Sequence, residues 1–214
     1  MPCSWFICNN IEKEKVECLL DHEIMRKDFG SKTYLYPQPV LIIASYDENG
    51  KIDVMNAAWG GICGEDKIAI CIDEGHKTTA NFLKTKAISV SVGVAKYVKE
   101  CDYVGIVSAN KDADKMSKVN WTYTKSSHVN APIINELPLT LECEVLSYND
   151  EEIMIARIVN VSIDDSVLTD NKVDVKKLEP ITYDPCNHTY IKLGEVAAKA
   201  FSVGLELKWE NIIQ

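Results

Sequence analysis

The stretch VLIIASYDENGKIDVMNAA, residues 40–58, contains two apolar segments separated by a short polar turn. Asn49 and Gly50 lie in the turn, and an Asn-Gly pair supplies the positive φ angles that a tight hairpin requires. The stretch therefore predicts two antiparallel strands joined at Asn49-Gly50, and it is the strongest local structural signal in the chain.

Further short strands are expected on both sides of a helix. The segments IAICID (68–73) and AISVSV (87–92) are β-branched and apolar, and TTANFLKTK (78–86) between them is expected to be a short helix. The segment AKYVKECDYVGI (95–106), together with Val94 just before it, has apolar residues at 94, 98, 101 and 105 or 106, which is the spacing of one helix face.

Two long strands are expected in residues 137–164, on either side of a turn at Tyr148-Asn149-Asp150. In the first of them polar and apolar residues alternate, which fits a half-buried strand of an antiparallel sheet or barrel. A polar loop (164–180), a strand (188–194) and a short helix (195–201) complete the expected order. The alternating residues are Leu139, Thr140, Leu141, Glu142, Cys143, Glu144 and Val145.

The composition favours one domain. A chain of 214 residues with 46% hydrophobic residues can bury one sizeable core without a metal or disulfides. We assign residues 31–214 to this domain and residues 1–30 to an N-terminal extension, in which residues 11–24 have the charge pattern of a short amphipathic helix.

Charge and cysteine usage exclude several classes of protein. A formal charge of −9 argues against a broad nucleic-acid surface. Eight cysteines without a C-x-x-C pair or zinc-type spacing indicate reduced thiols in a cytoplasmic protein and no metal site. The sequence also shows neither an apolar run long enough to span a membrane nor a signal peptide.

HKTTANF (76–82) allows two interpretations. Thr78 or Thr79 can cap a helix while Lys77 points to water. Alternatively, the first-turn N–H groups, the hydroxyls and Lys77 converge on a phosphate, which the helix dipole favours.

MNAAWGG (55–61) is equally open to two interpretations. Its small residues let the backbone approach a flat ligand closely, and exposed backbone groups can then bind the polar edge of a heteroaromatic ring. The alternative is a strand end at which a buried Trp59 anchors the barrel.

Taken in order, these segments resemble the flavin reductase-like family, whose members include flavoredoxins and NAD(P)H:flavin oxidoreductases. The quoted stretches are PVLIIASYDENGKIDVMNAAWGG, HKTTANF, CDYVGIVSANKDADKM and APIINELPLTLECEV. The resemblance implies a mainly β fold, an antiparallel Greek-key split barrel with short peripheral helices. It also implies a homodimer that binds FMN near the subunit interface.

The resemblance further implies which residues bind the cofactor. The stretch 56–59 is similar to the segment along the flavin ring and ribityl chain, and HKTTANF is similar to the phosphate-binding turn. GIVSANKDADKM (105–116) resembles the family's G-x-x-S-G followed by D-K, with Ala109 in place of the last glycine. Lys115 is therefore either a cofactor contact or a solvated surface lysine. The implied cofactor-binding residues are Asn56, Ala57, Ala58, Trp59, Lys77, Thr78, Thr79, Asn81, Ser108 and Lys115.

The implied function is that of an FMN-dependent oxidoreductase that takes electrons from NADH or NADPH and passes them to a further acceptor. The flavin carries out such chemistry itself, so we assign no catalytic side chain, nor any role to Cys63 or His188. No G-x-G-x-x-G follows a strand, which leaves open an electron carrier reduced by a partner protein. A barrel that binds a small ligand without redox chemistry is the third interpretation.

Overall fold

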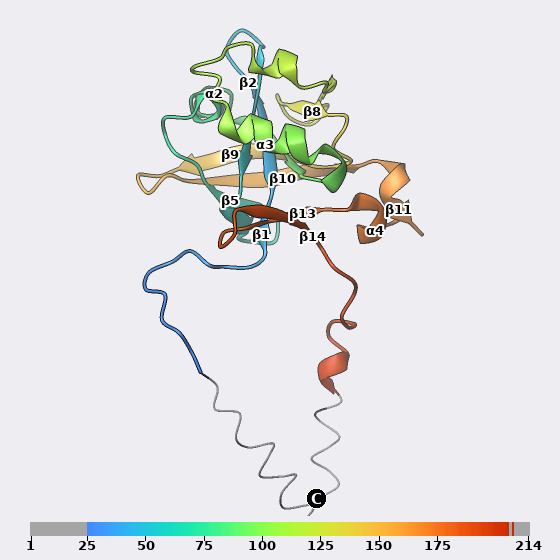
Figure 1. Ribbon diagram of the computed structural model, residues 1–214. Helices are drawn as coiled ribbons and strands as arrows, with labels where there is room; N and C mark the ends of the chain where they lie inside the picture. The colour runs from blue at the N-terminus through green and yellow to red at the C-terminus, as the bar shows by residue number, and fades with distance from the viewer. Residues whose placement is uncertain (1–24, 206, 208–214) are drawn as a thin grey trace, which may run out of the picture. The chain divides into compact units, whose positions relative to one another are not determined.

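A computed structural model describes residues 25–205 and residue 207 (Figure 1). The chain divides into two units, Met1–Thr33 and Tyr34–Gln214. In the first unit, residues 25–33 form neither helix nor strand. The helix expected at residues 11–24 lies outside the described residues.

The second unit is built on a seven-stranded antiparallel sheet, which curls into half of a barrel. This arrangement confirms the mainly β, antiparallel split-barrel fold expected from the sequence. In spatial order the strands are β3 (Ile52–Ala57), β2 (Leu41–Tyr46), β6 (Ala87–Val92), β9 (Leu139–Tyr148), β10 (Ile153–Ile163), β5 (Lys67–Cys71) and β4 (Gly60–Ile62).

Smaller elements surround this sheet. A three-stranded sheet has the order β1 (Gln38–Pro39), β13 (Ile181–Asp184), β14 (Thr189–Lys192). The two-stranded pairs are β7 (Tyr123–Lys125) with β8 (Pro132–Ile134), and β11 (Leu168–Thr169) with β12 (Lys172–Val173). The helices are α2 (Lys77–Thr85), α3 (Val98–Ile106) and α4 (Val175–Leu178), and the 3-10 turns are η1 (Ala95–Tyr97), η2 (Lys115–Lys118), η3 (Asp165–Val167) and η4 (Val203–Leu205).

The hairpin of residues 40–58 is confirmed, but its turn differs from the expected one. β2 pairs with β3 from Leu41↔Ala57 to Tyr46↔Ile52, which leaves a five-residue loop. Gly50 has a φ of 76° and Asn49 does not have a positive φ. The carboxylate of Asp47 closes the loop instead, because its Oδ1 accepts hydrogen bonds from the N–H groups of Asn49 and Lys51.

Both faces of β2 are buried, which explains its uninterrupted apolar sequence. Successive side chains of a strand point to opposite faces of the sheet. Ile42 and Ala44 therefore pack into one hydrophobic cluster, which also contains Val104 of α3. Leu41 and Ile43 pack into a second cluster on the opposite face.

The expected half-exposed alternation of β9 is wrong for Thr140 and Glu142, which are buried, whereas Glu144 is partly exposed. Thr140 and Glu142 are each 1% exposed. Their polar groups find partners from other strands and loops: the Thr140 hydroxyl bonds that of Ser91, and the Glu142 carboxylate accepts from Ser126 Oγ and from Asn160 Nδ2. Buried polar groups with such partners cost far less than unpaired ones.

The prediction of a helix at residues 195–201 is also wrong. Residues 193–199 have no regular structure, and a turn and η4 follow. Val196 and Phe201 are fully or nearly fully exposed, so a helix here would have no buried face, and short helices without packing are marginal in water.

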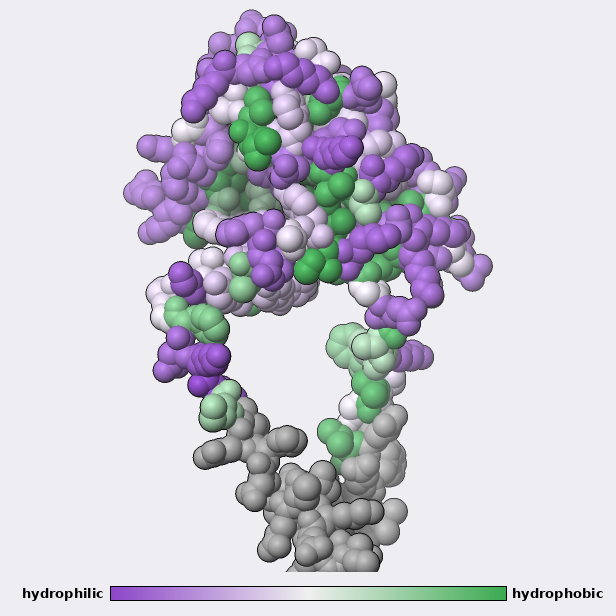
Figure 2. All heavy atoms as spheres, viewed as in Figure 1, coloured by the Kyte–Doolittle hydropathy of each residue, from purple (hydrophilic) through white to green (hydrophobic). Residues whose placement is uncertain are grey.

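The surface in the view of Figure 2 is mainly hydrophilic at the end of the barrel that carries α2, with hydrophobic patches elsewhere. Within the described ranges, no helix combines the length and apolar composition needed to cross a membrane.

Candidate functional site

Three connected cavities lie along β3. The hairpin cavity, of 330 Å³, lies beside the turn of the β2–β3 hairpin and contacts Ile52 and Asp53. The helix-start cavity, of 190 Å³, lies between the start of α2 and the end of α3 and contacts Asp53 and Met55. The tyrosine cavity, of 200 Å³, lies farther along β3 and contacts Asn56.

Neighbouring cavities share lining residues and therefore adjoin one another, and we call the three together the groove. The hairpin and helix-start cavities share four lining residues, Asp53, Lys77, Ala109 and Lys115. The helix-start and tyrosine cavities share Gly105 and Ile106 at the end of α3. The three cavities thus follow one another along β3 past the start of α2.

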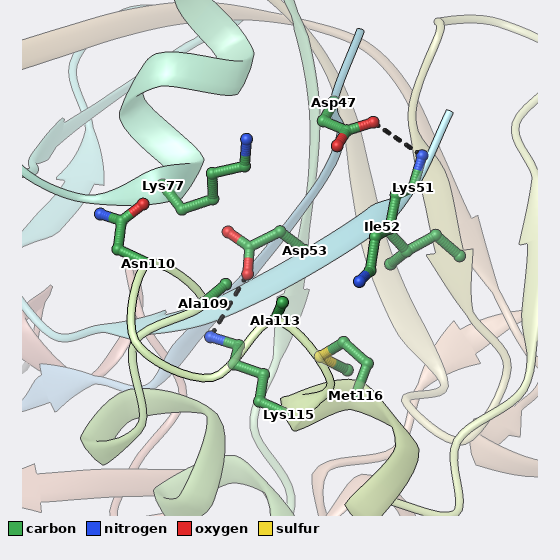
Figure 3. A pocket seen from close by; sticks show the side chains of 10 residues that line it. All are labelled: Asp47, Lys51, Ile52, Asp53, Lys77, Ala109, Asn110, Ala113, Lys115 and Met116. Atoms are coloured by element: carbon green, nitrogen blue, oxygen red, sulfur yellow. Dashed lines mark hydrogen bonds and ion pairs between the residues drawn. The ribbon is translucent and has the colours of Figure 1, made fainter. Parts of the chain in front are cut away.

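The start of α2 gives the middle of the groove its positive potential. The N–H groups of Lys77, Thr78 and Thr79 have no acceptor within the described part of the chain, and His76 provides no side-chain cap. Free N–H groups at a helix start attract anions. The Lys77 ammonium forms no ion pair with a described residue, so it adds an uncommitted positive charge (Figure 3).

The side chains that follow Lys77 are committed to the fold. Thr78 Oγ1 donates to Asp53 Oδ2 at 2.6 Å, and Thr79 Oγ1 donates to the carbonyl of Asp73 at 2.7 Å. Asn81 Nδ2 donates to Ser45 Oγ at 3.1 Å. These bonds attach α2 to β2, β3 and the preceding loop, and they leave the backbone N–H group as the part of Thr78 that remains free to bind a ligand in the helix-start cavity.

Lys115 is a buried residue. It is 2% exposed, and its ammonium lies 3.3 Å from Asp53 Oδ1 (Figure 3). The same ammonium donates to the carbonyl of Val107 at 2.9 Å and is 3.4 Å from that of Val104, so it also caps the end of α3. The interpretation of Lys115 as a solvated surface lysine is therefore wrong, and its charge offsets that of Asp53 beside the helix-start cavity.

The loop after α3 forms the wall opposite α2. Ser108 lines the helix-start cavity, and its hydroxyl accepts from the N–H of Asn110 at 3.3 Å. Asn110 Nδ2 donates to the carbonyl of Gly75 at 2.8 Å. This last bond connects the loop to the residues just before α2.

The tyrosine cavity depends on a close approach of α3 to β3. A Cβ on Gly105 would lie 3.0 Å from Cβ of Asn56, so any larger residue would crowd this contact. Asn56 Nδ2 donates to the carbonyl of Cys101 at 3.1 Å and fixes the two elements together. On the opposite side the hydroxyl of Tyr190 donates to Asp102 at 2.8 Å, and burial and this bond raise the pKa of Tyr190.

Three residues on segments beside the groove complete its description. Trp59 is 56% exposed, so the interpretation of Trp59 as a buried anchor is wrong. His188 has a φ of 55° and its Nδ1 bonds the Tyr183 hydroxyl at 2.7 Å, while Tyr183 itself lines the tyrosine cavity. Cys63 is exposed and free.

The structure brings six of the ten expected site residues to the groove. Ala57, Trp59, Thr79 and Asn81 do not line these three cavities. Sequence reasoning assigned no role to several lining residues, because their contacts with the groove arise only in the fold. The six are Asn56, Ala58, Lys77, Thr78, Ser108 and Lys115, and the missed residues include Asp53, Met55, Asp102, Gly105, Ile106, Tyr183 and Tyr190.

The two ends of the groove differ chemically. Three lysines and two carboxylates line the hairpin cavity, whereas aromatic and aliphatic side chains line much of the tyrosine cavity. The carboxylate of Asp47 accepts backbone hydrogen bonds that hold its pKa below its usual range, so it is ionised at neutral pH. No cluster of metal-binding side chains occurs in the part of the chain that the structure describes. The groove thus suits a ligand with a phosphate and a flat, largely apolar end.

Comparisons with known proteins identify a matching family and similar solved structures. The family model for the flavin reductase like domain matches residues 33–184. The structure is similar to the flavoredoxin of Desulfovibrio vulgaris (Miyazaki F), with 32% sequence identity, a TM-score of 0.81, and coverage of 84% of this chain and 100% of that chain.

More distant solved structures share the fold. The flavoredoxin from Methanosarcina acetivorans has 22% identity and a TM-score of 0.78, covering 86% of this chain and 99% of its own. An FMN-binding domain of a flavin reductase-like enzyme from Shewanella baltica has 16% identity and a TM-score of 0.69, and the match covers 76% of this chain and 89% of that chain.

Proposed function

From the premise that this chain belongs to the flavin reductase-like family, we propose that the groove along β3 binds FMN and that the protein is an FMN-dependent oxidoreductase. The observation that carries the proposal is the order of features in the groove. A cationic helix start lies in its middle, and an apolar, tyrosine-lined cavity lies at one end.

The residues of the groove fit FMN in this orientation. The free N–H groups at the start of α2 and the ammonium of Lys77 would hold the phosphate, and the Ser108 hydroxyl lies in the same cavity. The Asp53 carboxylate would otherwise repel a phosphate, but Lys115 offsets its charge at 3.3 Å. Asn56 and Ala58 line the cavity that would receive the flavin ring.

When bound, FMN would supply the redox chemistry, by accepting a hydride from NADH or NADPH and passing electrons to a further acceptor. The protein then has to orient the ring, hold the phosphate and leave one ring face accessible. We assign these tasks to the tyrosine cavity and to the start of α2, and no described side chain is required as a general acid or base.

A second candidate is an electron carrier that a partner protein reduces. The 32% identity to a flavoredoxin favours this candidate, as does the lack of a dinucleotide-binding G-x-G-x-x-G motif in the chain. Anaerobic mixing of the FMN-loaded protein with NADH or NADPH separates the two. Loss of the oxidised-flavin absorbance supports the reductase, and no loss with either nucleotide supports the carrier.

The test of cofactor binding is a titration of the protein with FMN and with riboflavin, which lacks the phosphate. Lys77→Met should weaken FMN binding by about 1.5–3 kcal/mol, roughly 10- to 150-fold, because it removes a charge-assisted contact. Riboflavin binding should change by less than about threefold. Lys111→Met is the matched control, since Lys111 is exposed and lines none of the three cavities. Equal losses for both flavins would place the phosphate elsewhere.

We further propose a homodimer in the cytoplasm. Three exposed apolar side chains, Trp59, Ile62 and Ile106, lie on segments next to the tyrosine cavity, and burial by a second copy would remove them from water. Light scattering on the purified protein checks the mass, and a monomer at micromolar concentration would contradict the dimer. Cell fractionation checks the location.

A further inference from the structure

We propose that Asp53 accepts a hydrogen bond from a protonated flavin phosphate, so that the site binds FMN as the phosphate monoanion and takes up a proton with it. The inference rests on the proposed function, because it takes the flavin phosphate to lie at the start of α2. It assigns a role to a buried carboxylate that the binding of an anion does not by itself require.

Asp53 is a buried acceptor whose hydrogen bonds are incomplete. The residue is 4% exposed and lines both the helix-start and the hairpin cavities. Its Oδ2 accepts from Thr78 Oγ1 at 2.6 Å, but its Oδ1 accepts no hydrogen bond from any described residue. The Lys115 ammonium lies 3.3 Å from Oδ1 and donates to the carbonyl of Val107 instead. Since buried carboxylate oxygens normally have a donor, a donor on the ligand would complete the site.

The position of Asp53 brings this acceptor to the phosphate. Its carboxylate lies between the side chains of Lys77 and Lys115 (Figure 3). It also holds the side chain of Thr78, whose backbone N–H group is one of the free donors at the helix start. A phosphate held by that N–H group and by Lys77 would therefore lie beside Asp53.

The chemistry of the two groups decides which form of the phosphate fits. An ionised carboxylate only accepts hydrogen bonds, and so does a phosphate dianion, so the two would repel each other in a buried site. A phosphate monoanion carries one O–H group, which can donate a charge-assisted bond to Oδ1. The second pKa of a phosphate monoester is about 6, so near neutral pH the proton is taken from solvent at small cost.

The charged and titratable groups that share a cavity with Asp53 come from three elements. Lys115 offsets the charge of Asp53 but donates no hydrogen bond to it. Histidine side chains titrate between about pH 5 and pH 8, so the histidine at the start of α2 needs a variant of its own. The groups are Asp47 and Lys51 of the hairpin turn, His76 and Lys77 at the start of α2, and Lys115 of η2.

The experiment measures the affinities of the full chain for FMN and riboflavin by fluorescence titration between about pH 6 and pH 8, at constant ionic strength. FMN binding should weaken at least about tenfold over this range, and riboflavin binding should change by less than about twofold. Calorimetry near pH 7.5, in buffers of different ionisation enthalpy, should find an uptake of about one proton per FMN. Inorganic phosphate should compete with FMN, and sulfate should not, because sulfate has no O–H group at this pH.

Variants assign the effect to Asp53. Asp53→Asn should abolish the proton uptake and flatten the pH dependence of FMN binding, because an amide can donate to a phosphate dianion. Asp53→Asn with Lys115→Met leaves no unpaired buried charge and should behave in the same way, so the test does not depend on the folding of the single variant. Both His76→Gln and Asp112→Asn should keep the proton uptake, and Asp112 lines none of the three cavities.

Three results would overturn the inference and leave the proposed function intact. The first is an FMN affinity that stays constant or rises with pH, without proton uptake. The second is loss of the uptake in His76→Gln, which would make the histidine the proton acceptor. The third is an equal weakening of FMN and riboflavin in Asp53→Asn, since Oδ1 would then bond a ribityl hydroxyl. Failure of both flavins to bind the wild type would instead refute the proposed function.

Discussion

Replacing Lys115 with Met should destabilise the protein strongly, although Lys115 lies in a segment of surface-like composition. The substitution keeps most of the side-chain volume and removes the ammonium. Asp53 would then remain buried, with its Oδ1 facing no cation and only the Thr78 hydroxyl donating to Oδ2. The carbonyl of Val107 would lose its donor as well.

The magnitude follows from burial. The side chains of Lys115 and Asp53 are 3% and 5% exposed, so solvent screens their interaction little. Removing one partner of a buried ion pair costs about 3–5 kcal/mol, because the other charge stays desolvated and unpaired. With a urea m-value of about 2 kcal/mol per molar, the unfolding midpoint should fall by about 2 M.

Urea unfolding of the flavin-free protein, followed by circular dichroism, measures this change. The double variant Asp53→Asn with Lys115→Met removes both charges and should recover most of the loss, since two neutral groups replace the pair. Lys118→Met is the matched control, because Lys118 in the same 3-10 turn pairs with Asp112 at the surface and should contribute less than about 1 kcal/mol. A Lys115→Met variant within about 1 kcal/mol of the wild type would refute the reasoning.

Three further outcomes are expected. Gly105→Ala should lower the free energy of unfolding by about 1 kcal/mol. The new Cβ would lie 3.0 Å from that of Asn56, and the cost of this crowding should exceed the gain in helix propensity from alanine. A variant that is more stable than the wild type in urea unfolding would contradict this. Asp184 accepts hydrogen bonds that hold its pKa in the folded protein below the usual value near 4. Its contribution to the free energy of unfolding is therefore present above pH 4 and is lost as the pH falls through the pKa of the folded state. Asp184→Asn should therefore flatten the acid side of the stability profile, and an unchanged slope between pH 5 and pH 2 would count against this account. Ellman's reagent with mass mapping should label exposed Cys71 in the native protein, but label Cys143 only on unfolding, because burial raises the pKa of the Cys143 thiol to about 12.

Local pattern was sufficient to predict the strands of the large sheet except β4. The apolar runs of β2 and β6 and the helix at 77–85 are recognisable from residues that adjoin each other in the chain, because period and turn chemistry are local properties. The buried polar face of β9 is not local in this sense. Glu142 is accommodated inside because Ser126 and Asn160 come to it from other segments, and the alternation of β9 alone resembles that of a half-exposed strand.

The candidate site also combines residues that local sequence predicts with residues that it does not. Lys77 is predictable, since it stands at a recognisable helix start. The burial of Lys115 is not, because it depends on Asp53 of a distant strand and on the end of α3. Gly105 stands first in the stretch that resembles G-x-x-S-G, but the sequence does not show its packing role, which depends on the approach of Asn56.

The hydrogen bond from Asn110 to Gly75 has a consequence for how a ligand enters the groove. It joins the two walls to each other, and the buried contacts of Asp53 attach both walls to β3, so the walls cannot easily separate. The tip of the β2–β3 hairpin is attached to its surroundings only by exposed ion pairs among the described residues, Lys51 with Asp114 and Glu48 with Lys84, and such pairs break at little cost. Opening of the groove should therefore be a hinge motion of the hairpin tip, and cross-linking that tip to the loop after α3 should slow flavin association more than it changes affinity.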